Sequence, residues 1–383
     1  MQIPFHKPYI TEDEVSEVLD TVRSGWLTMG PRTLQFEQEF SKYVGSPHAV
    51  AVNSGTSALH LALKAIDLKP GDEVIVPTMT FTATAEVVCY FNATPILVDI
   101  ERDTHNMDVS LIEKTITPRT RAIIPVHYGG QPCDMDAIME IARSRGLYVI
   151  EDAAHSLPAW YGEKSVGTIG DLTCFSFYAT KPLAAGEGGM VTTENGDWAE
   201  RIRVLRLHGI SKDAWKRYSA GGSWYYEVTE VGYKYNMTDV QAALALSQLR
   251  KLDFMWERRK YITKMYSEGF SGSEAITTPT FRPDRVSSFH LYPIKINPDA
   301  LTIDRAQFIE ELGKRSIGTS VHFIPLHRHP FYRNRFSYDE KDFPEAEWVY
   351  ERLISLPVYP GMSNREIEYV INSVNDISTK HKK

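Results

Sequence analysis

Lys181 is the residue whose sequence surroundings are least usual for its type. It lies in FSFYATKPLAAGEGGMV (175–191), and it is the one charged residue between Cys174 and Gly186. An apolar setting disfavours the ammonium form, which lowers the pKa of a lysine from about 10.4 and makes the amine nucleophilic. Nucleophilic lysines form Schiff bases with aldehydes, and the glycines of 186–189 permit close approach of the backbone. An exposed turn lysine is the alternative.

An acid follows another apolar run. Asp152 comes directly after the strand-like residues 147–151, and His155 lies three positions further on. A carboxylate at the end of an apolar strand is costly unless it meets a positive partner. A helix cap or an internal salt bridge would satisfy Asp152, and so would the protonated ring nitrogen of a ligand.

A phosphate-binding turn is the third feature. NSGTSALHL (53–61) places Gly55, Thr56 and Ser57 between a strand-like run and a helical one. The unpaired N–H groups and the dipole of a helix start attract phosphate. Neither a Walker loop nor a GxGxxG turn is present, which argues against a nucleotide-sugar dehydrogenase. An ordinary Ser/Thr N-cap would have the same sequence.

These features together indicate pyridoxal phosphate. The cofactor needs a phosphate cradle, an acid for its ring nitrogen and a lysine for its aldehyde. Thr56 and Ser57 would supply the first, Asp152 the second and Lys181 the third. Phe81, in PTMTFTAT (77–84), offers an aromatic face for the ring, although as a lone aromatic it would be read as core.

The elements that must position these residues alternate in type. Nearly continuous apolar runs alternate with helical patterns, which is typical of a parallel sheet covered on both faces, and so of an α/β domain. Ligands of such sheets lie at the carboxyl ends of the strands, where these polar residues fall. Strands are predicted at 48–54, 72–77, 94–100, 120–128, 147–154, 173–179 and 189–194, and helices at 57–66, 83–91 and 134–146.

The rest of the chain predicts a second, smaller unit. Residues 239–269 form a long amphipathic helical stretch, followed by a strand-like run at 288–296 and a helix at 302–316. At 383 residues the chain exceeds one ordinary compact unit. We expect a large cofactor-binding α/β domain with an N-terminal arm (1–250) and a small α+β domain (251–383). The aromatic, Gly-rich stretch 218–228 is expected to be a mobile loop or an ordered patch under a partner chain.

Composition excludes several classes. Hydrophobic residues make up 43% and charged residues 24%, with a net charge of −7 and scattered basic residues, so no nucleic-acid footprint is indicated. Apolar runs are too short for a membrane span, and no secretory segment is seen at the start. The chain has three widely spaced cysteines and no CxxC pair: Cys89, Cys133 and Cys174. An odd number without such pairs favours reduced thiols in the cytoplasm. His327 and His329 lack acidic or cysteine companions, so no metal is predicted.

At this point the chain resembles the pyridoxal-phosphate-dependent sugar aminotransferases of the DegT/DnrJ/EryC1/StrS family, nearly end to end. The motifs that carry the resemblance are SGWLTMGP (24–31), NSGTSALHLAL (53–63), PTMTFTATA (77–85), IIPVHYGGQPCDMDAI (123–138), EDAAHSLPAWY (151–161), FSFYATKPLAAGEGGMV (175–191), LRLHG (205–209) and GYKYNMTDVQAAL (232–244). The resemblance implies the fold-type-I architecture with a mixed seven-stranded sheet. It also implies a homodimer whose active sites lie at the subunit interface.

The resemblance also implies residue roles. Lys181 would bond the cofactor and shuttle protons, and Asp152 would pair with the ring nitrogen. The other implied cofactor-binding residues are Thr56, Ser57, Phe81, His155, Ser176, Lys234 and Asn236. Of these, Lys234 and Asn236 belong to the loop that reaches the neighbouring subunit, and the family often has Asn and Arg at these two positions. Expected substrate contacts are Thr28, Arg206, His208 and His322.

The implied reaction moves an amino group from L-glutamate to a keto-deoxy sugar on a nucleotide diphosphate. The Lys-Tyr-Asn sequence at 234–236 resembles relatives that aminate the 4-position, including the 4-amino-arabinose type. A 3-keto sugar is the alternative substrate, and a non-catalytic regulatory protein on the same fold is the alternative function. Relatives with His in place of this lysine are dehydratases, so Lys181 favours amination.

Overall fold

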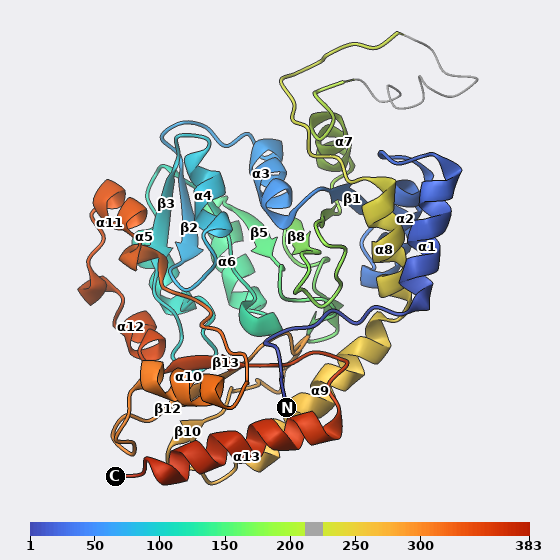
Figure 1. Ribbon diagram of the computed structural model, residues 1–383. Helices are drawn as coiled ribbons and strands as arrows, with labels where there is room; N and C mark the ends of the chain where they lie inside the picture. Colours follow the sequence, from blue (N-terminus) through green and yellow to red (C-terminus); the bar gives the residue numbers. More distant parts are fainter. Residues whose placement is uncertain (211–224) are drawn as a thin grey trace.

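The protein is built around a seven-stranded sheet with strand order β1-β9-β8-β5-β4-β2-β3, seen in a computed structural model that describes residues 1–210 and 225–383 (Figure 1). Its strands are β1 (His48–Val52), β2 (Glu73–Pro77), β3 (Thr94–Val98), β4 (Thr120–Ile123), β5 (Tyr148–Asp152), β8 (Leu172–Ser176) and β9 (Gly189–Thr193). β9 pairs antiparallel with both β1 and β8, and the other neighbours pair parallel. The predicted mixed seven-stranded α/β fold is confirmed.

Helices cover both faces of this sheet, because alternate strand residues point to opposite faces. On β1, Val50 and Val52 join one buried cluster, whereas Ala49 and Ala51 join another. The first cluster includes α3 (Gly55–Ala65), α4 (Ala83–Cys89) and α7 (Gly196–Leu205). The opposite face packs against α2 (Pro31–Val44) and α8 (Asp239–Arg250) near β1, and against α5 (Ile112–Thr115) and α6 (Met135–Arg145) further along. α1 (Glu12–Ser24) lies beside α8 (Figure 1).

Most predicted elements exist, with two differences of extent. The strand predicted at 120–128 ends at Ile123, because Pro125 has no N–H for the ladder, and pairing resumes only as a bridge between Val126 and Asp152. The helical stretch 239–269 is two helices, α8 and α9 (Leu252–Gly269), which meet at the non-helical Lys251.

A second sheet lies at the bottom of Figure 1, with strand order β10-β12-β13. Its strands are β10 (Ile276–Thr277), β12 (Tyr292–Ile296) and β13 (Leu353–Leu356), and it shares a core with α9, α10 (Arg305–Lys314) and α13 (Asn364–Lys380). Two further helices, α11 (Pro330–Phe336) and α12 (Pro344–Tyr350), contribute residues to the core of the large sheet instead. A small sheet joins β6 (Trp160–Tyr161), β7 (Lys164–Ser165) and β11 (Arg285–Val286). The division of the chain at residue 250 stays a prediction.

The N-terminal arm connects distant parts of the chain. Ile3 is 1% exposed and lies in the core of the second sheet, where its N–H donates to the carbonyl of Ser316 (2.9 Å) and its carbonyl accepts from Gly318 (2.8 Å). A Cβ atom on Gly318 would lie 2.5 Å from the backbone nitrogen of Phe5, so the arm fits only against glycine there. Further along, the carbonyl of Tyr9 accepts from the Gln248 side chain of α8 (2.8 Å).

Candidate functional site

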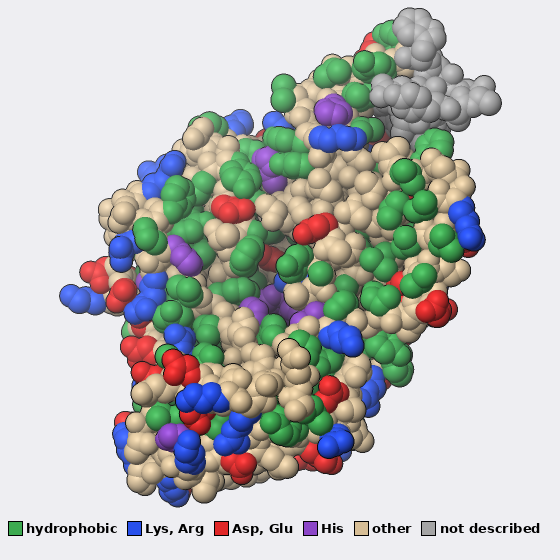
Figure 2. Space-filling model, in the orientation of Figure 1, with side chains coloured by type: hydrophobic (Ala, Val, Ile, Leu, Met, Phe, Trp, Pro, Cys, Tyr) green, Lys and Arg blue, Asp and Glu red, His purple; other side chains and the backbone are tan. Residues whose placement is uncertain are grey.

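A cavity of about 480 Å³ opens at the carboxyl ends of the central strands, and we call it the central cavity. Figure 2 shows the hollow near the middle of this face, with histidines along its margin. Strand ends, the N-terminal arm and the C-terminal third of the chain all contribute to its walls. The structure brings seven predicted site residues together in its lining: Thr56, Phe81, Asp152, His155, Ser176, Lys181 and His322.

Lys181 follows β8 in a turn in which its N–H donates to the carbonyl of Tyr178 (2.9 Å). Burial lowers the pKa of Lys181 to about 8, and the carboxylate of Asp152 partly counteracts this by favouring the ammonium form. An amine with this pKa is neutral in an appreciable fraction of molecules near neutral pH. Lys181 therefore combines the nucleophilicity and the proton-transfer capacity expected from its sequence setting.

Asp152 is the last residue of β5 and is 5% exposed. Its Oδ2 accepts a hydrogen bond from Thr84 Oγ1 (2.8 Å), and its Oδ1 accepts from the N–H of Ala154 (3.1 Å). Burial raises the pKa of Asp152, while these two donors and Lys181 act in the opposite direction. Within the described part of the chain, no Arg, Lys or His forms an ion pair with it. A buried carboxylate of this kind suits a cationic ring nitrogen.

The start of α3 forms the wall beside β8. Ser54 caps the helix by accepting from the N–H of Ser57 (3.0 Å), and the Ser57 hydroxyl donates to Asn53 Oδ1 (2.6 Å). Gly55 approaches Ser176 so closely that a Cβ on Gly55 would lie 2.9 Å from the Cβ of Ser176. The helix start, Thr56 and Ser176 thus form a cradle of donors that fits a phosphate, whereas Ser57 lies behind it.

Aromatic rings and imidazoles form the remaining walls. The ring of His155 stacks on Phe323 at a centroid distance of 5.9 Å and lies 4.6 Å from the ring of His290. Its Nδ1 accepts from the N–H of Gly129 (3.3 Å), and burial together with Lys181 and His322 holds the pKa of His155 well below its ordinary value. Phe81 is 60% exposed at the rim. The imidazole of His155 is therefore neutral at physiological pH.

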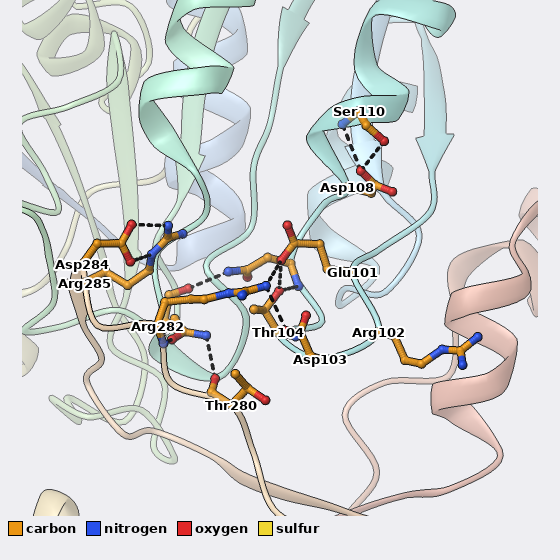
Figure 3. Close-up of polar contacts among 12 residues, drawn as sticks. Glu101, Arg102, Asp103, Thr104, Asp108, Ser110, Thr280, Arg282, Asp284 and Arg285 are labelled. Atoms are coloured by element: carbon orange, nitrogen blue, oxygen red, sulfur yellow. Dashed lines mark hydrogen bonds and ion pairs between the residues drawn. The ribbon is translucent and has the colours of Figure 1, made fainter.

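The segment 282–288 packs against the backbone of residues 129–155 and supports His155. Ser288 donates from its N–H to the carbonyl of Gly130 (3.1 Å) and from its hydroxyl to the carbonyl of His155 (2.5 Å). The same segment carries Arg282, whose N–H donates to the side chain of Gln131 (2.7 Å). Figure 3 shows Arg282 reaching toward Glu101 and Asp103, with Arg282 Nη2 2.9 Å from Asp103 Oδ2.

Arg206 does not lie in the central cavity. It is 3% exposed, it pairs with the carboxylate of Glu37, and its Nη1 donates to the carbonyl of Ala51 (2.6 Å). Its charge is already balanced inside the protein, so it is not available to meet a diphosphate in this cavity. The sequence shows a cation in LRLHG, but its acidic partner is 169 positions away.

The other predicted residues also lie outside the lining. Lys234 is exposed and donates to Oδ1 of the buried Asn236 (2.6 Å), which forms a bridge with Val52. His208 and Thr28 are exposed. Residues 218–224 of the predicted loop lie outside the described residues, and Tyr225 and Tyr226 are exposed. His327 is buried, with Nδ1 2.7 Å from the Thr78 hydroxyl.

Sequence reasoning missed several residues of the site. Thr84 contacts Asp152 directly, and Thr80, His290 and Phe323 line the central cavity. Thr80 and Thr84 lie within PTMTFTATA, the motif that contains the predicted Phe81, and their hydroxyls are 2.8 Å apart, so a signal existed. Both His290 and Phe323 come from the C-terminal third; nothing near His290 in the sequence indicates a site, whereas Phe323 directly follows the predicted contact His322. In the described part of the chain, no helix has the length and apolarity that crossing a membrane requires.

Comparison with known proteins gives matches along nearly the whole chain. Residues 8–375 match the family described as the DegT/DnrJ/EryC1/StrS aminotransferase family. The spore coat polysaccharide biosynthesis protein SpsC of Bacillus subtilis is 50% identical over 98% of this chain and 97% of its own. The sugar aminotransferase Spr1654 of Streptococcus pneumoniae, solved in its PLP form, is 37% identical with a TM-score of 0.92, covering 99% of both chains. PseC of Helicobacter pylori, an aminotransferase of pseudoaminic acid biosynthesis, is 29% identical with a TM-score of 0.93, covering 99% of this chain and all of that one.

Proposed function

Because this chain belongs to the DegT/DnrJ/EryC1/StrS aminotransferase family, we propose that it moves an amino group from L-glutamate to the 4-position of a keto-deoxy sugar carried on a nucleotide diphosphate. The observation that carries the proposal is the meeting of Lys181 and Asp152 in one cavity beside the start of α3. The chain has Lys181 at the position where related dehydratases have His, and this favours amination.

Pyridoxal phosphate is the cofactor, as the sequence predicted: the family is one of aminotransferases, and Spr1654 is solved in both PLP and PMP forms. When bound, it supplies an aldehyde that bonds amines and a ring that accepts an electron pair. The cradle of Thr56 and Ser176 would hold its phosphate, Asp152 its ring nitrogen and Lys181 its aldehyde. Because Nδ1 of neutral His155 accepts from Gly129, its proton lies on Nε2, which would donate a hydrogen bond beside the ring without adding charge.

Lys181 Nζ would also move the proton. Once an incoming amine has released Lys181 from the aldehyde, its neutral amine would take the proton from the α-carbon of glutamate and deliver it to the cofactor carbon that had bonded the lysine. In the second half of the reaction it would take a proton from that carbon and deliver it to the sugar carbon that receives the amino group. A pKa near 8 lets one nitrogen act as base and then as acid, since neither form is strongly disfavoured at neutral pH.

The nucleotide would extend toward the rim. The central cavity of about 480 Å³ would hold the cofactor, with Phe81 over its ring, and a sugar, and the exposed aromatic side chain of Tyr178 also lies in its lining. Aromatic faces at a mouth suit stacking of a base. His322, also in the lining, is neutral because burial lowers its pKa to about 4, and it is placed to hydrogen-bond the sugar.

We propose that the protein works as a homodimer with shared sites. Lys234, Asn236, His208 and Thr28 do not line the cavity of their own chain, yet the resemblance assigns them to cofactor or substrate. In a homodimer, the 232–236 loop of one chain would reach the cavity of its partner, which would account for both the assigned roles and the positions of these residues. We also propose a cytoplasmic location, which the free thiols Cys89, Cys133 and Cys174 support.

The first test replaces the lysine. Lys181→Ala should abolish the visible absorbance of the lysine–cofactor bond and reduce turnover at least about 10³-fold, because it removes both the covalent anchor and the base. Lys164→Ala, at an exposed lysine, is the matched control and should behave as wild type. An active, yellow Lys181→Ala protein would overturn the assignment.

The second test identifies the sugar. Purified holoenzyme is incubated with L-glutamate and a panel of nucleotide-linked 4-keto and 3-keto sugars, and 2-oxoglutarate release is measured. Release with 4-keto sugars alone is expected. Release with 3-keto sugars alone would move the proposal to that alternative, and release with neither would remove the nucleotide-sugar assignment.

A further inference from the structure

Thr84 makes a contact that helix-start threonines seldom make. It is the second residue of α4 and is fully buried, and its hydroxyl donates to Asp152 Oδ2 (2.8 Å), 68 positions along the chain. A threonine at such a position usually bonds its own helix. Here the hydroxyl instead bonds to a residue outside its own helix, and this hydrogen bond connects the segment after β2 to the end of β5.

A second hydroxyl contacts that of Thr84. Thr80 Oγ1 lies 2.8 Å from Thr84 Oγ1, and Thr80 lines the central cavity at 2% exposure. Each hydroxyl has one proton, and an ionised carboxylate accepts only. With Asp152 ionised, Thr84 therefore donates its proton to Asp152 and accepts from Thr80, and this order stabilises the charged form of Asp152.

The carboxylate is also held at its other oxygen. The N–H of Ala154 donates to Oδ1 (3.1 Å), so Asp152 receives one donor on each oxygen. Two donors on opposite oxygens fix the rotation of the carboxylate plane. They leave one lone pair on each oxygen for a further donor, and Asp152 itself lines the cavity.

We propose that Thr84 is a positioning residue that holds Asp152 charged and aimed at the ring nitrogen of the cofactor, and that Thr80 orients the Thr84 hydroxyl. The inference rests on the proposed function, since it assigns the ring nitrogen to Asp152. Neither threonine touches the reacting atoms in this arrangement. Their effect passes through the acid, which must stay ionised to keep that nitrogen protonated.

The test compares Thr84→Val, which keeps the shape and removes the hydroxyl, with Thr84→Ser, which restores it. Thr82→Val is the matched control, because the Thr82 hydroxyl lies two positions away and contacts Tyr332 instead (2.8 Å). Holoenzymes are compared by cofactor dissociation constant, by the pH midpoint of their visible absorbance and by kcat. Thermal unfolding checks that each variant is folded.

Losing one hydrogen bond to a charged group should weaken cofactor binding about 10-fold and shift the absorbance midpoint, and kcat should fall more than KM rises. Thr84→Ser should lie within about threefold of wild type, and Thr80→Val should show a smaller loss of the same kind. A folded Thr84→Val protein with unchanged constants would overturn the proposal. So would a Thr84→Ser protein as impaired as Thr84→Val, since shape rather than the hydroxyl would then matter. If Thr84→Val does not fold, Thr80→Val decides by the same readouts.

Asp152→Asn separates this inference from the proposed function. If Asp152→Asn leaves cofactor binding and absorbance unchanged, the assignment of the ring nitrogen fails, and the function with it. If Asp152→Asn weakens binding but Thr84→Val does not, only the role of Thr84 fails. In the Asp152→Asn background, Thr84→Val should have no additional effect on the absorbance midpoint, because the acid it acts on is gone.

Discussion

Two acids that are neighbours in the sequence, Glu151 and Asp152, lie on opposite faces of β5. Successive side chains of a strand point to opposite faces, so Asp152 reaches the central cavity while Glu151 is buried behind it. Glu151 pairs with His127 (2.8 Å) and accepts from Thr173 (2.7 Å). Burial lowers the pKa of His127, while the Glu151 carboxylate acts in the opposite direction. The N–H of Cys133 donates to His127 Nδ1 (3.1 Å), so the ring carries its proton on Nε2 and donates it to Glu151.

Breaking this pair is expected to destabilise the protein. The Glu151 carboxylate accepts from His127 Nε2, Thr173 and the N–H of Gly170, and the amide NH₂ of Glu151→Gln cannot accept, so at least one buried donor loses its partner at a cost of about 1–3 kcal/mol. Urea unfolding followed by circular dichroism measures the loss, with exposed Glu163→Gln as the control. A loss below about 1 kcal/mol would contradict this account, because it would show that the glutamine side chain satisfies the same buried donors.

The electrostatics of Lys181 give a prediction with a definite sign. Burial lowers the pKa of Lys181 to about 8 and the Asp152 carboxylate raises it, so Asp152→Asn should lower it further. The rate at which cofactor-free protein reacts with pyridoxal phosphate should rise with pH through about 8 in wild type, and the midpoint should move to lower pH in Asp152→Asn. A midpoint that moves upward would contradict the pairing of these two groups.

At the scale of elements, buried polar contacts hold α1 against α8. Glu14 of α1 is 1% exposed and forms an ion pair with Lys251, and it accepts from Ser247 (2.8 Å) and Gln248 (2.9 Å) of α8. Burial by itself raises the pKa of Glu14, yet the hydrogen bonds from Lys251 and its neighbours lower it to about 2. The stabilisation depends on the ionised carboxylate.

This tie should be lost in acid. Because the folded pKa of about 2 lies below the ordinary value of 4.5, the tie contributes fully above about pH 4.5 and is lost as pH falls toward 2. Glu14→Gln should cost about 2 kcal/mol at neutral pH. The gap between its unfolding free energy and that of wild type should shrink below pH 4.5. Exposed Asp20→Asn in the same helix is the control, and a pH-independent gap would contradict the mechanism.

The elements were largely predictable from sequence, and the site in part. Continuous apolar runs between turns identified the strands, and strand ends then located Lys181 and Asp152. Contacts between residues far apart in the sequence were not predicted. Arg206 looks like a ligand cation in LRLHG until Glu37 is found beside it, and Thr84 looks like an ordinary helix residue until β5 places Asp152 next to it. Local patterns give types and ends, while contacts between distant segments depend on packing.

At the scale of the whole molecule, the N-terminal arm ties the second sheet to the central cavity. Ile3 is buried in the core of that sheet, while Phe5 and His6 line the cavity. Ile3→Ala should cost about 2–4 kcal/mol of unfolding free energy, since it removes buried methyl groups. It should also raise KM for the sugar, because the arm that carries Phe5 is loosened.

The matched control for this prediction is Ile10→Ala, at an isoleucine of the same arm that is 45% exposed. Steady-state kinetics and thermal unfolding measure both effects. A stability loss without any change in KM would show that the cavity wall holds Phe5 independently of Ile3.

The same arm gives a glycine far from the chemistry an influence over it. Gly318 faces the backbone of residues 3–5 with no room for a methyl group. In a random mutagenesis screen scored by colony phenotype, substitutions at codon 318 should therefore appear among the inactive clones. Second-site suppressors should arise in the first five codons rather than around the lysine, which would mark the arm as a mechanical link.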